Sequence, residues 1–350
     1  MKMDANQRVN LLLNVLADGE FHSGQHLAEQ IGISRTAIWK LVAKLQSWDI
    51  EIYSVKGKGY KIPDGLNLID KSKLDSLVEN KLKHFPQIDL LTTIDSTSTY
   101  ISNKWDESVE SRNGQNKNFT SSGRVCIAEH QSKGRGRKGN QWISPFGANL
   151  YFSIGIELPV GLSVLGGLSL AIGIGLTEAI NKITAKKVKL KWPNDLLCEN
   201  QKLAGILVEA SGDSNDTSFI NIGIGINWDM PEKFSKEINQ PWINLLEISS
   251  KNIDKTTLTA NLLIELDQTI DQFIHQGFDA FSKKWGKNSA FIDQTITIKT
   301  HNGNIDGIEK GIDKNGAIVV ITSHGEKTFY SGEVSLRGPG LKRQGLKELA

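Results

Sequence analysis

The chain has 350 residues, enough for two or three domains, and its formal net charge at pH 7 is only +2. This near balance excludes a general polyanion binder, so a nucleic-acid partner would have to be recognised by a local basic patch. Two cysteines without metal-ligand spacing exclude a disulfide framework and indicate a reducing compartment. Because no apolar run is long enough to span a bilayer, we expect a cytoplasmic protein with no membrane partner.

Residues 1–64 have the pattern of a winged helix-turn-helix. Helices are predicted at 8–17 and at 25–31, the second capped by Ser23, and Ser34 caps a third helix with apolar positions at helical spacing. Residues 50–62 alternate around a Lys-Gly-Lys-Gly turn, which predicts a β-hairpin wing. The outward face of the third helix and the wing form the candidate DNA-binding set: Ser34, Arg35, Thr36, Trp39, Lys40, Lys44, Lys56 and Lys58. The alternative is a winged helix that contacts only protein.

Residues 65–288 alternate between strand and helix patterns and predict a mixed sheet with helices on one side. The expected strands are 88–92, 124–129, 149–157, 188–192, 205–210 and 219–226, and the expected helices are 71–83, 99–104, 162–183 and 256–276. Residues 106–123 are polar and lack periodicity, which indicates a mobile surface loop.

Residues 289–340 are rich in strands joined by short turns and predict a small C-terminal β-barrel. Its expected strands are 294–300, 304–310, 317–322 and 327–331. Residues 341–350 are expected to form a flexible tail. The fold class is therefore α+β, in three domains.

The most informative segment is 131–142, in which four cations (Lys133, Arg135, Arg137 and Lys138) stand between three glycines. Such a loop has little intrinsic structure, and an anion at its centre would offset the repulsion of its charges. Its glycines also satisfy the dinucleotide fingerprint, but Trp142-Ile-Ser-Pro-Phe-Gly follows where that fingerprint needs a helix. The remaining alternative is a solvated basic loop.

Other polar groups stand at predicted strand ends. Lys191, Asn194 and Asp195 suit a phosphate–Mg²⁺ site, although an Asn-Asp turn with a surface lysine would explain them equally. Lys202 could meet a carboxylate or could simply extend into solvent, and Gly205 inside its strand indicates close approach of a ligand or backbone.

Hydroxyl groups gather at the start of the predicted helix 99–104. Ser96, Thr97 and Ser98 could bind a small polar ligand or cap the helix, and capping explains one of the three but not all. Together with the amide of Asn227 and the cationic loop, these groups are an inventory suited to activating a carboxylate with a nucleotide.

Five stretches in order, 134–137, 144–150, 191–195, 202–207 and 225–227, resemble the motifs of the bacterial bifunctional biotin–protein ligase and biotin operon repressor family. The resemblance covers nearly the whole chain. It implies a catalytic domain like that of class II aminoacyl-tRNA synthetases and an ATP-dependent, AMP-forming biotin–[acetyl-CoA-carboxylase] ligase. Its substrates would be ATP with Mg²⁺ and biotin, the corepressor precursor. The implied partners are a biotin carboxyl carrier protein, operator DNA and, promoted by biotinyl-5′-AMP, a second copy of the chain.

The resemblance also implies residue roles. The biotin-binding set would be Ser96, Thr97, Ser98, Gln131, Arg135, Gly136, Arg137, Lys202 and Gly205. The ATP and adenylate set would be Arg135, Arg137, Trp142, Lys191, Asn194, Asp195, Asn227 and Arg337. Lys202, Arg137 and Lys191 would be catalytic, and Asp195 would bind Mg²⁺.

The chain departs from the family pattern where Ser98 replaces the usual Asn and where Asn140 and Gln141 replace later basic residues of the loop. We expect residues 134–138 to act as a lid that orders over biotin and its adenylate. Two alternatives stay open: a ligand-sensing repressor with an inactive ligase domain, and a lipoate-type ligase.

Overall fold

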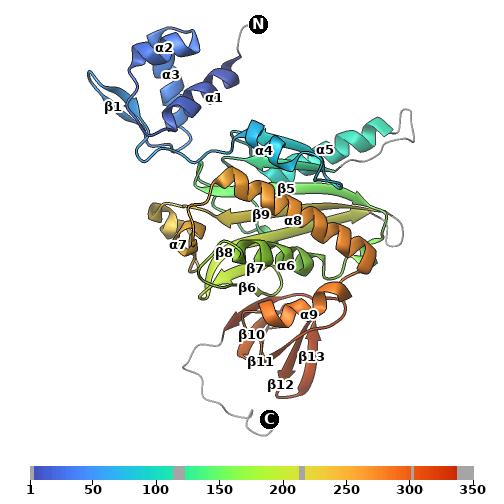
Figure 1. The fold of residues 1–350 in the computed structure, drawn as a ribbon. Helices are drawn as coiled ribbons and strands as arrows, with labels where there is room; N and C mark the ends of the chain where they lie inside the picture. Colours follow the sequence, from blue (N-terminus) through green and yellow to red (C-terminus); the bar gives the residue numbers. More distant parts are fainter. Residues whose placement is uncertain (1–3, 113–122, 213–216, 301–302, 337–350) are drawn as a thin grey trace.

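The computed structural model describes residues 4–112, 123–212, 217–300 and 303–336, and it arranges them as three units in a row (Figure 1). The first is a winged helix-turn-helix, as predicted. Its elements are α1 (Ala5–Leu16), α2 (Gly24–Ile31), α3 (Arg35–Gln46) and the antiparallel hairpin of β1 (Tyr53–Val55) and β2 (Gly59–Lys61). Ser23 and Ser34 accept hydrogen bonds from backbone N–H groups in the first turns of α2 and α3, so both predicted caps are confirmed.

The second unit is built on a seven-stranded sheet in the order β3-β4-β5-β9-β8-β7-β6. Its strands are β3 (Gln87–Leu91), β4 (Arg124–Ala128), β5 (Asn149–Leu158), β6 (Val188–Lys191), β7 (Asp195–Cys198), β8 (Gln201–Gly212) and β9 (Ser218–Asn227). The β3–β4 pair is parallel and the other pairs are antiparallel. The mixed sheet is therefore confirmed, with one unpredicted strand, β7.

Helices cover both faces of this sheet, so the prediction of helices on one side is wrong. The main core joins one face to α4 (Lys71–Val78), α6 (Leu168–Asn181) and α8 (Lys255–Gln276). On the opposite face, α5 (Thr97–Arg112) packs Ile101 against Cys126 and Phe219. Neighbouring residues of a strand point to opposite faces, so Cys126 meets α5 while Val125 and Ile127 belong to the main core.

Several predicted boundaries shift. The helix predicted from residue 162 begins at Leu168, because Gly167 has a left-handed φ of 82° and a separate 3₁₀ turn (Leu162–Val164) precedes it. Helix α5 continues through Arg112, so the prediction of a loop from residue 106 is wrong for 106–112, and 113–122 lie outside the described residues. The 3₁₀ segment Glu232–Glu237, α7 (Leu245–Ile248) and α9 (Asp279–Asn288) were not predicted.

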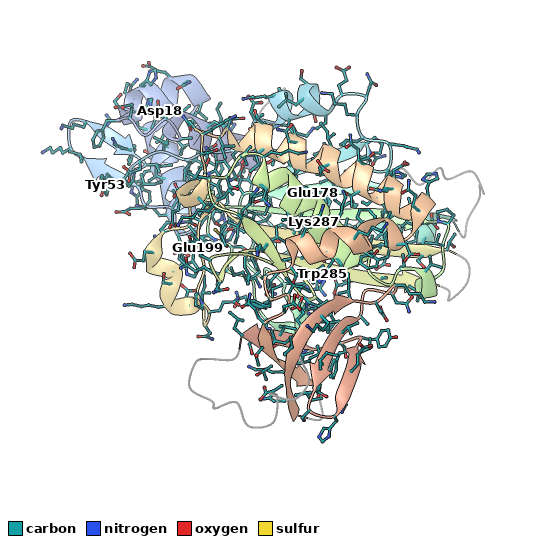
Figure 2. All side chains as sticks on the ribbon, turned by 60° about the horizontal axis from the view of Figure 1, so that its bottom comes forward. Asp18, Tyr53, Glu178, Glu199, Trp285 and Lys287 are labelled. Carbon is teal, nitrogen blue, oxygen red and sulfur yellow. The ribbon has the colours of Figure 1, made fainter. Side chains whose placement is uncertain are left out.

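The third unit is a five-stranded antiparallel sheet in the order β13-β12-β11-β10-β14. Its strands are β10 (Thr295–Thr300), β11 (Gly303–Ile312), β12 (Ile318–Thr322), β13 (Gly325–Phe329) and β14 (Glu333–Leu336). Across the described residues β13 and β14 form the two edges and do not pair, so the predicted barrel is not closed. Helix α9 lies over this sheet and carries the buried Trp285 (Figure 2). Residues 337–350, which hold Arg337 and the predicted tail, lie outside the described residues.

An aromatic contact joins the winged helix to the central unit. Phe146, which precedes β5, is buried in the winged-helix core, and its ring stacks on Trp48 at 5.7 Å and 3°. A hydrogen bond of 2.5 Å from Thr92 Oγ1 to Asn10 Oδ1 adds a polar contact. Within the described ranges, no helix has both the length and the apolar character needed to cross a membrane.

Candidate functional site

The sheet face beneath α5 holds the candidate site. In the paired strands β8 and β9, Gly205 lies opposite Gly225, Leu207 opposite Gly223, and Glu209 opposite Asn221. The glycines leave a recess in the sheet surface, and the polar pair lies at its outer end. This face is therefore shaped to receive a ligand rather than a second apolar layer.

A cavity of about 60 Å³ opens onto this face beside the start of α5. The Gln131 side-chain oxygen accepts from Thr97 N at 2.9 Å and from Thr97 Oγ1 at 3.1 Å, and Thr97 Oγ1 also bonds Ser153 Oγ at 2.8 Å. Gln131 Nε2 donates to Ser144 Oγ at 3.0 Å. This buried network fixes donors and acceptors at the cavity wall, as recognition of a small polar group requires.

The three hydroxyls at the start of α5, on Ser96, Thr97 and Ser98, have different tasks. Ser96 Oγ accepts from Thr99 N at 3.5 Å and caps the helix, whereas Thr97 belongs to the cavity network. Ser98 Oγ donates to Glu209 Oε2 at 3.0 Å. The expectation that capping explains only one of the three is confirmed.

Trp142 separates the small cavity from a larger cleft of about 710 Å³ and lines both. Its indole lies on the glycine recess so closely that a Cβ on Gly225 would be 2.4 Å from Cε2, and one on Gly205 would be 2.9 Å from Cζ3. Lys202 Nζ stands 5.3 Å from the ring centroid. Glycine at these two positions is what allows Trp142 to occupy the passage.

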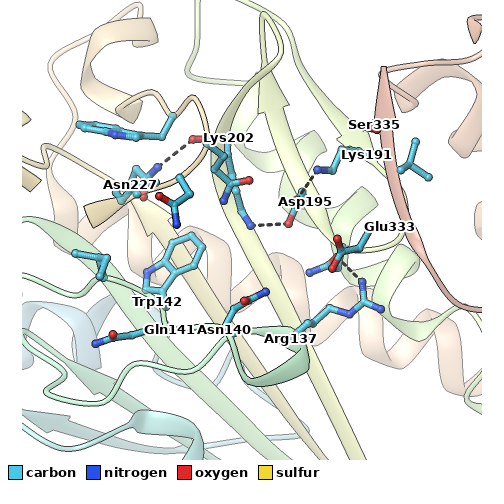
Figure 3. A pocket seen from close by; sticks show the side chains of 18 of the residues that line it. Arg137, Asn140, Gln141, Trp142, Lys191, Asp195, Lys202, Asn227, Glu333 and Ser335 are labelled. Atoms are coloured by element: carbon cyan, nitrogen blue, oxygen red, sulfur yellow. Dashed lines mark hydrogen bonds and ion pairs between the residues drawn. The ribbon is translucent and has the colours of Figure 1, made fainter. Parts of the chain in front are cut away.

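Three charged residues meet in the larger cleft (Figure 3). Asp195 binds Lys191 Nζ at 3.0 Å and Lys202 Nζ at 2.8 Å, and all three side chains are largely buried. Burial alone would raise the pKa of Asp195, but the charges and hydrogen bonds of Lys202 and Lys191 outweigh it and lower this pKa below its usual value. The carboxylate thus stays ionised and holds two ammonium groups side by side.

The local fold explains how these residues meet. Strands β6 and β7 form a hairpin through the cis Trp192–Pro193 bond, so Asn194 lies in the turn and Asp195 begins β7 instead of ending the preceding strand. The register between β7 and β8 shifts between Leu196 and Leu197, which pair with Ala204 and Lys202. This irregularity brings Lys202 to the ligand face, and its ion pair contradicts the alternative of a lysine that merely extends into solvent.

The candidate Mg²⁺ site offers few protein ligands. Asp195 is the one carboxylate of the predicted set Lys191, Asn194 and Asp195, and each of its oxygens already meets a lysine. No cluster of three or more His, Cys, Asp or Glu side chains suited to a metal occurs in the described part of the chain. This donor set fits an ion held chiefly by substrate phosphates and does not fit a metal caged by protein.

The glycine–arginine loop is folded as a short hairpin. Trp142 N donates to Gly134 O at 3.0 Å, Gly136 N donates to Asn140 O at 2.7 Å, and Arg135 bridges Gln141. Lys138 and Gly139 form its tip with left-handed φ angles of 55° and 77°. Since β5 rather than a helix follows, the dinucleotide-fingerprint reading is excluded.

Three of the loop's cations meet partners on three different elements. Arg135 pairs with Glu209 of β8, Arg137 Nη1 donates to Asn194 Oδ1 at 2.9 Å, and Lys138 Nζ lies 3.5 Å from Glu333 of β14. The loop therefore spans the cleft from the sheet to the C-terminal unit. Asn140 and Gln141, the departures from the family pattern, line the same cleft.

Most predicted site residues converge on these two hollows. The small cavity is lined by Ser96, Thr97, Ser98, Gln131, Arg135, Gly136, Arg137, Trp142, Asn194, Lys202 and Gly205, and the cleft adds Lys191, Asp195 and Asn227. Asn227 Nδ2 donates to Lys202 O at 3.0 Å. Arg337 lies outside the described residues.

Sequence reasoning missed several lining residues. They are Ser153, Glu209, Trp242, the segment 237–240 and Glu333. Sequence reasoning also missed Asn221, which lies behind the site and donates to Ser98. Alternation along β8 could have indicated Glu209, because every second residue of a strand lies on the same face and Glu209 is two and four residues beyond Leu207 and Gly205. The segment 237–240 has no such pattern.

The winged helix presents the predicted DNA-binding set to solvent. All eight of its side chains are exposed, and Trp39 on α3 is 61% exposed. Lys44 Nζ lies 5.4 Å from the Trp48 ring, which also stacks on Phe146 of the central unit. A cationic helix face that also exposes Trp39 suits contact with a polyanionic groove.

Comparison with known proteins accounts for the whole arrangement. Residues 8–61 match an HTH domain family, residues 92–227 the Biotin/lipoate A/B protein ligase family, and residues 291–337 the Biotin protein ligase C terminal domain. The Bifunctional ligase/repressor BirA of Salmonella typhimurium is 39% identical over 326 residues, spanning 93% of this chain and 96% of that protein. The chain belongs to the BirA family.

As a BirA-family member, the chain is a bifunctional ligase/repressor of the biotin protein ligase fold. The BirA of Escherichia coli is equally similar, at 39% identity over 93% of this chain and 96% of that protein. Among solved structures, "Biotin protein ligase from Aquifex aeolicus in complex with biotin and ATP" superposes with a TM-score of 0.57 and 28% identity. It covers 72% of this chain and 99% of that chain.

Proposed function

We propose that the chain activates biotin with Mg·ATP to biotinyl-5′-AMP and transfers biotin to a lysine of a biotin carboxyl carrier protein of acetyl-CoA carboxylase. The observation that carries this proposal is the junction between the small cavity and the cationic cleft, where Lys202 and Trp142 line both. A carboxylic acid seated in the cavity would direct its carboxylate toward Lys202. A triphosphate in the cleft would lie beside Lys191 and Arg137.

In the first step, a biotin carboxylate oxygen bonds to the α-phosphorus of ATP, and the bond to the β-phosphate bridging oxygen breaks to release pyrophosphate. Two anions must approach each other, and charge builds up on the α-phosphate oxygens. Lys202, Lys191 and Arg137 supply fixed cations for this charge, and we assign them the catalytic roles. Asp195 holds the two lysines side by side and orients them.

We assign biotin recognition to the residues of the small cavity. Thr97 and Gln131 would serve the ureido group, since their network supplies fixed donors and acceptors there. The other members of the biotin set are Ser96, Ser98, Arg135, Gly136, Arg137, Lys202 and Gly205.

We assign nucleotide recognition to Trp142, Asn194 and Asn227, which line the cleft, and to Arg135, which lines the small cavity. Arg337, outside the described residues, completes this set. Bound Mg²⁺ would neutralise phosphate charge. Asp195 is the protein group that could hold it together with phosphate oxygens.

In the second step, a neutral lysine amine of the carrier attacks the acyl carbon of the mixed anhydride, the bond to the phosphate oxygen breaks, and AMP leaves as the amine loses a proton. The mixed anhydride is easily hydrolysed. A glycine–arginine loop that closes over the cleft would exclude water until the carrier arrives.

The decisive assay is ATP-dependent transfer of biotin to a purified carrier domain, read by the mass of the carrier. We expect transfer that requires ATP. Binding of biotin without transfer would favour the ligand-sensing repressor with an inactive ligase domain. Transfer of lipoate in preference to biotin, with greater heat stabilisation by lipoate, would favour the lipoate-type ligase.

We propose further that the winged helix binds operator DNA of biotin-synthesis genes and that biotinyl-5′-AMP promotes the homodimer that binds it. The exposed cationic face of α3 and the wing supports DNA contact. Arg35→Ala should weaken operator binding, measured by fluorescence anisotropy, and leave carrier biotinylation unchanged, since Arg35 is far from the cleft along the chain. Sedimentation with and without the adenylate tests dimerisation, and loss of ligation in Arg35→Ala would contradict the separation of the two activities.

A further inference from the structure

Glu209 is a polar residue on the ligand face that none of the assigned roles uses. It lies on β8 two residues beyond Leu207, directly opposite Asn221 on β9. One carboxylate oxygen pairs with Arg135 Nη2, and the other accepts from Ser98 Oγ at 3.0 Å. Both of its oxygens are therefore occupied by groups from two other parts of the site.

The platform beneath Glu209 is rigid. Asn221, which is 2% exposed, donates to Ser98 O at 2.8 Å, to Ser98 Oγ at 3.1 Å and to Ser102 Oγ at 3.0 Å. Ser98 itself is 4% exposed. The carboxylate is thus held by buried neighbours before Arg135 reaches it, so little side-chain entropy remains to be lost when the pair forms.

The two arginines of the loop consequently face different partners. Arg137 donates to Asn194 Oδ1 at the rim of the Lys191–Asp195–Lys202 cluster, where an anion would lie. Arg135 turns instead to a carboxylate on the sheet, and its Nη1 also approaches Ser98 Oγ at 3.5 Å. A guanidinium bound to a protein carboxylate is anchored and is less able to meet a substrate anion.

We propose that Glu209, held by Ser98 and Asn221, is the anchor for Arg135 that fixes the 134–142 hairpin over the site, so that Glu209 is a positioning residue for retention of the adenylate. Arg135 then serves the biotin and nucleotide sets by positioning the hairpin, and Arg137 is the arginine that faces the reacting anions. Ser98 stands where the family usually has Asn, and here the Ser98 hydroxyl is the donor that orients Glu209. The identity of the retained ligand, biotinyl-5′-AMP, rests on the proposed ligase function. The contact between Arg135 and Glu209 does not depend on that function.

Loss of this anchor should change how fast the adenylate is released more than how fast it is formed. Without the carboxylate, the hairpin would still fold but would open more often, because its tip keeps only the Arg137 and Lys138 contacts. Glu209→Gln should therefore speed release of biotinyl-5′-AMP about 3- to 10-fold, the range expected for one charge-assisted contact in a half-exposed setting. The single-turnover rate of adenylate formation at saturating biotin and ATP should change less.

The experiment measures two quantities in the full chain. The first is the rate of tryptic cleavage at Lys133–Lys138 without substrates, which reports hairpin opening directly. The second is dissociation of labelled biotinyl-5′-AMP. The matched control is Glu265→Gln, which removes the ion pair between Glu265 of α8 and Lys182 at the end of α6. We expect faster cleavage and faster release in Glu209→Gln and no change in the control.

A double-mutant cycle with Ser98→Ala tests the network. Ser98→Ala should act in the same direction with a smaller effect, and the two effects should not add, because both act through one carboxylate. Additive effects, or cleavage and release at the control's rates, would overturn the anchor. Slower release in Glu209→Gln would also overturn it, since Glu209 would then compete with the ligand for Arg135. If the chain formed no adenylate, the ligase proposal would fail while the cleavage rates still tested the anchor.

Discussion

At the scale of single residues, the most consequential arrangement is the carboxylate of Asp195 between two lysines. The sequence placed Lys191, Asn194 and Asp195 in one short motif, but Lys202 joins them only through the β7–β8 pairing. With both oxygens paired, the Asp195 carboxylate holds two ammonium groups side by side at the cleft and offsets their mutual repulsion.

Loss of Lys202 should disable the first step. Lys202→Met removes the cation that lies at the junction of the cavity and the cleft, so the rate of biotin-dependent ATP–pyrophosphate exchange should fall about 10²- to 10³-fold. Lys182→Met, which removes a lysine that is 68% exposed on the surface, is the matched control and should retain activity. A fall of less than tenfold would show that Lys202 is not the principal cation.

The lowered pKa of Asp195 predicts how its contribution to stability changes with pH. Because the folded pKa lies below the usual value of 3.8, the stabilising contribution is present above that value and is lost as pH falls through the folded pKa. Asp195→Asn should therefore destabilise the central unit most at neutral pH and less at about pH 3. Urea denaturation at the two pH values checks this, and a destabilisation that grows on acidification would contradict it.

At the scale of elements, the strands β8 and β9 and the hairpin 134–142 form one working surface. Paired glycines recess the sheet, the hairpin places Trp142 in that recess, and the arginines secure the hairpin at its sides. On this face the paired residues are thus glycines where the indole lies and a polar pair, Glu209 and Asn221, where the loop is held.

Gly225→Ala tests the recess. Its Cβ would lie 2.4 Å from Trp142 Cε2, so the indole must move and the passage between cavity and cleft must change shape. We expect weaker biotin binding by calorimetry and a loss of about 1–3 kcal/mol of stability. Gly286→Ala on α9 is the control, because no atom lies within 4 Å of its added Cβ. Equal effects of the two substitutions would contradict the role of the glycine recess in holding Trp142.

At the scale of the whole molecule, a short path of contacts joins the site to the winged helix. Ser144 bonds Gln131 at the cavity, and two residues later Phe146 stacks on Trp48, just beyond the end of α3. A buried ion pair between Lys255 Nζ and Glu129 Oε2, at 2.9 Å, connects α8 to the residue that follows β4. Glu129 also accepts a hydrogen bond from the backbone N–H of Ile69, which lies between the winged helix and α4. The candidate ligand site and the winged helix are therefore linked through packed, hydrogen-bonded residues.

Phe146→Ala should loosen this link. Deleting a buried aromatic ring typically costs about 3–5 kcal/mol, and here the loss falls on the contact between two units. We expect the winged helix to unfold in a separate, earlier thermal transition and the region 62–68 to be cleaved faster by protease. Tyr330→Ala, at a residue that is 71% exposed, is the control; a single unchanged transition in Phe146→Ala would contradict the link.

The sequence by itself determined the features that depend on neighbouring residues. Helical spacing and the serines Ser23 and Ser34 predicted the winged helix, and alternation predicted most strands, because caps and periodicity act within a few residues. The chemistry of the site was also readable, since Arg137, Lys191 and Lys202 stand in short, distinctive motifs. Residue types and local geometry carry that information.

Only the tertiary structure decided which distant groups meet. The pairing of Arg135 with Glu209 joins residues 74 positions apart, and the register shift that brings Lys202 to Asp195 depends on how two strands align. The placement of α5 on its own face of the sheet and the open C-terminal sheet likewise depend on packing between whole elements. Such contacts are selected by the burial and register of the complete fold, which no local pattern in the chain specifies.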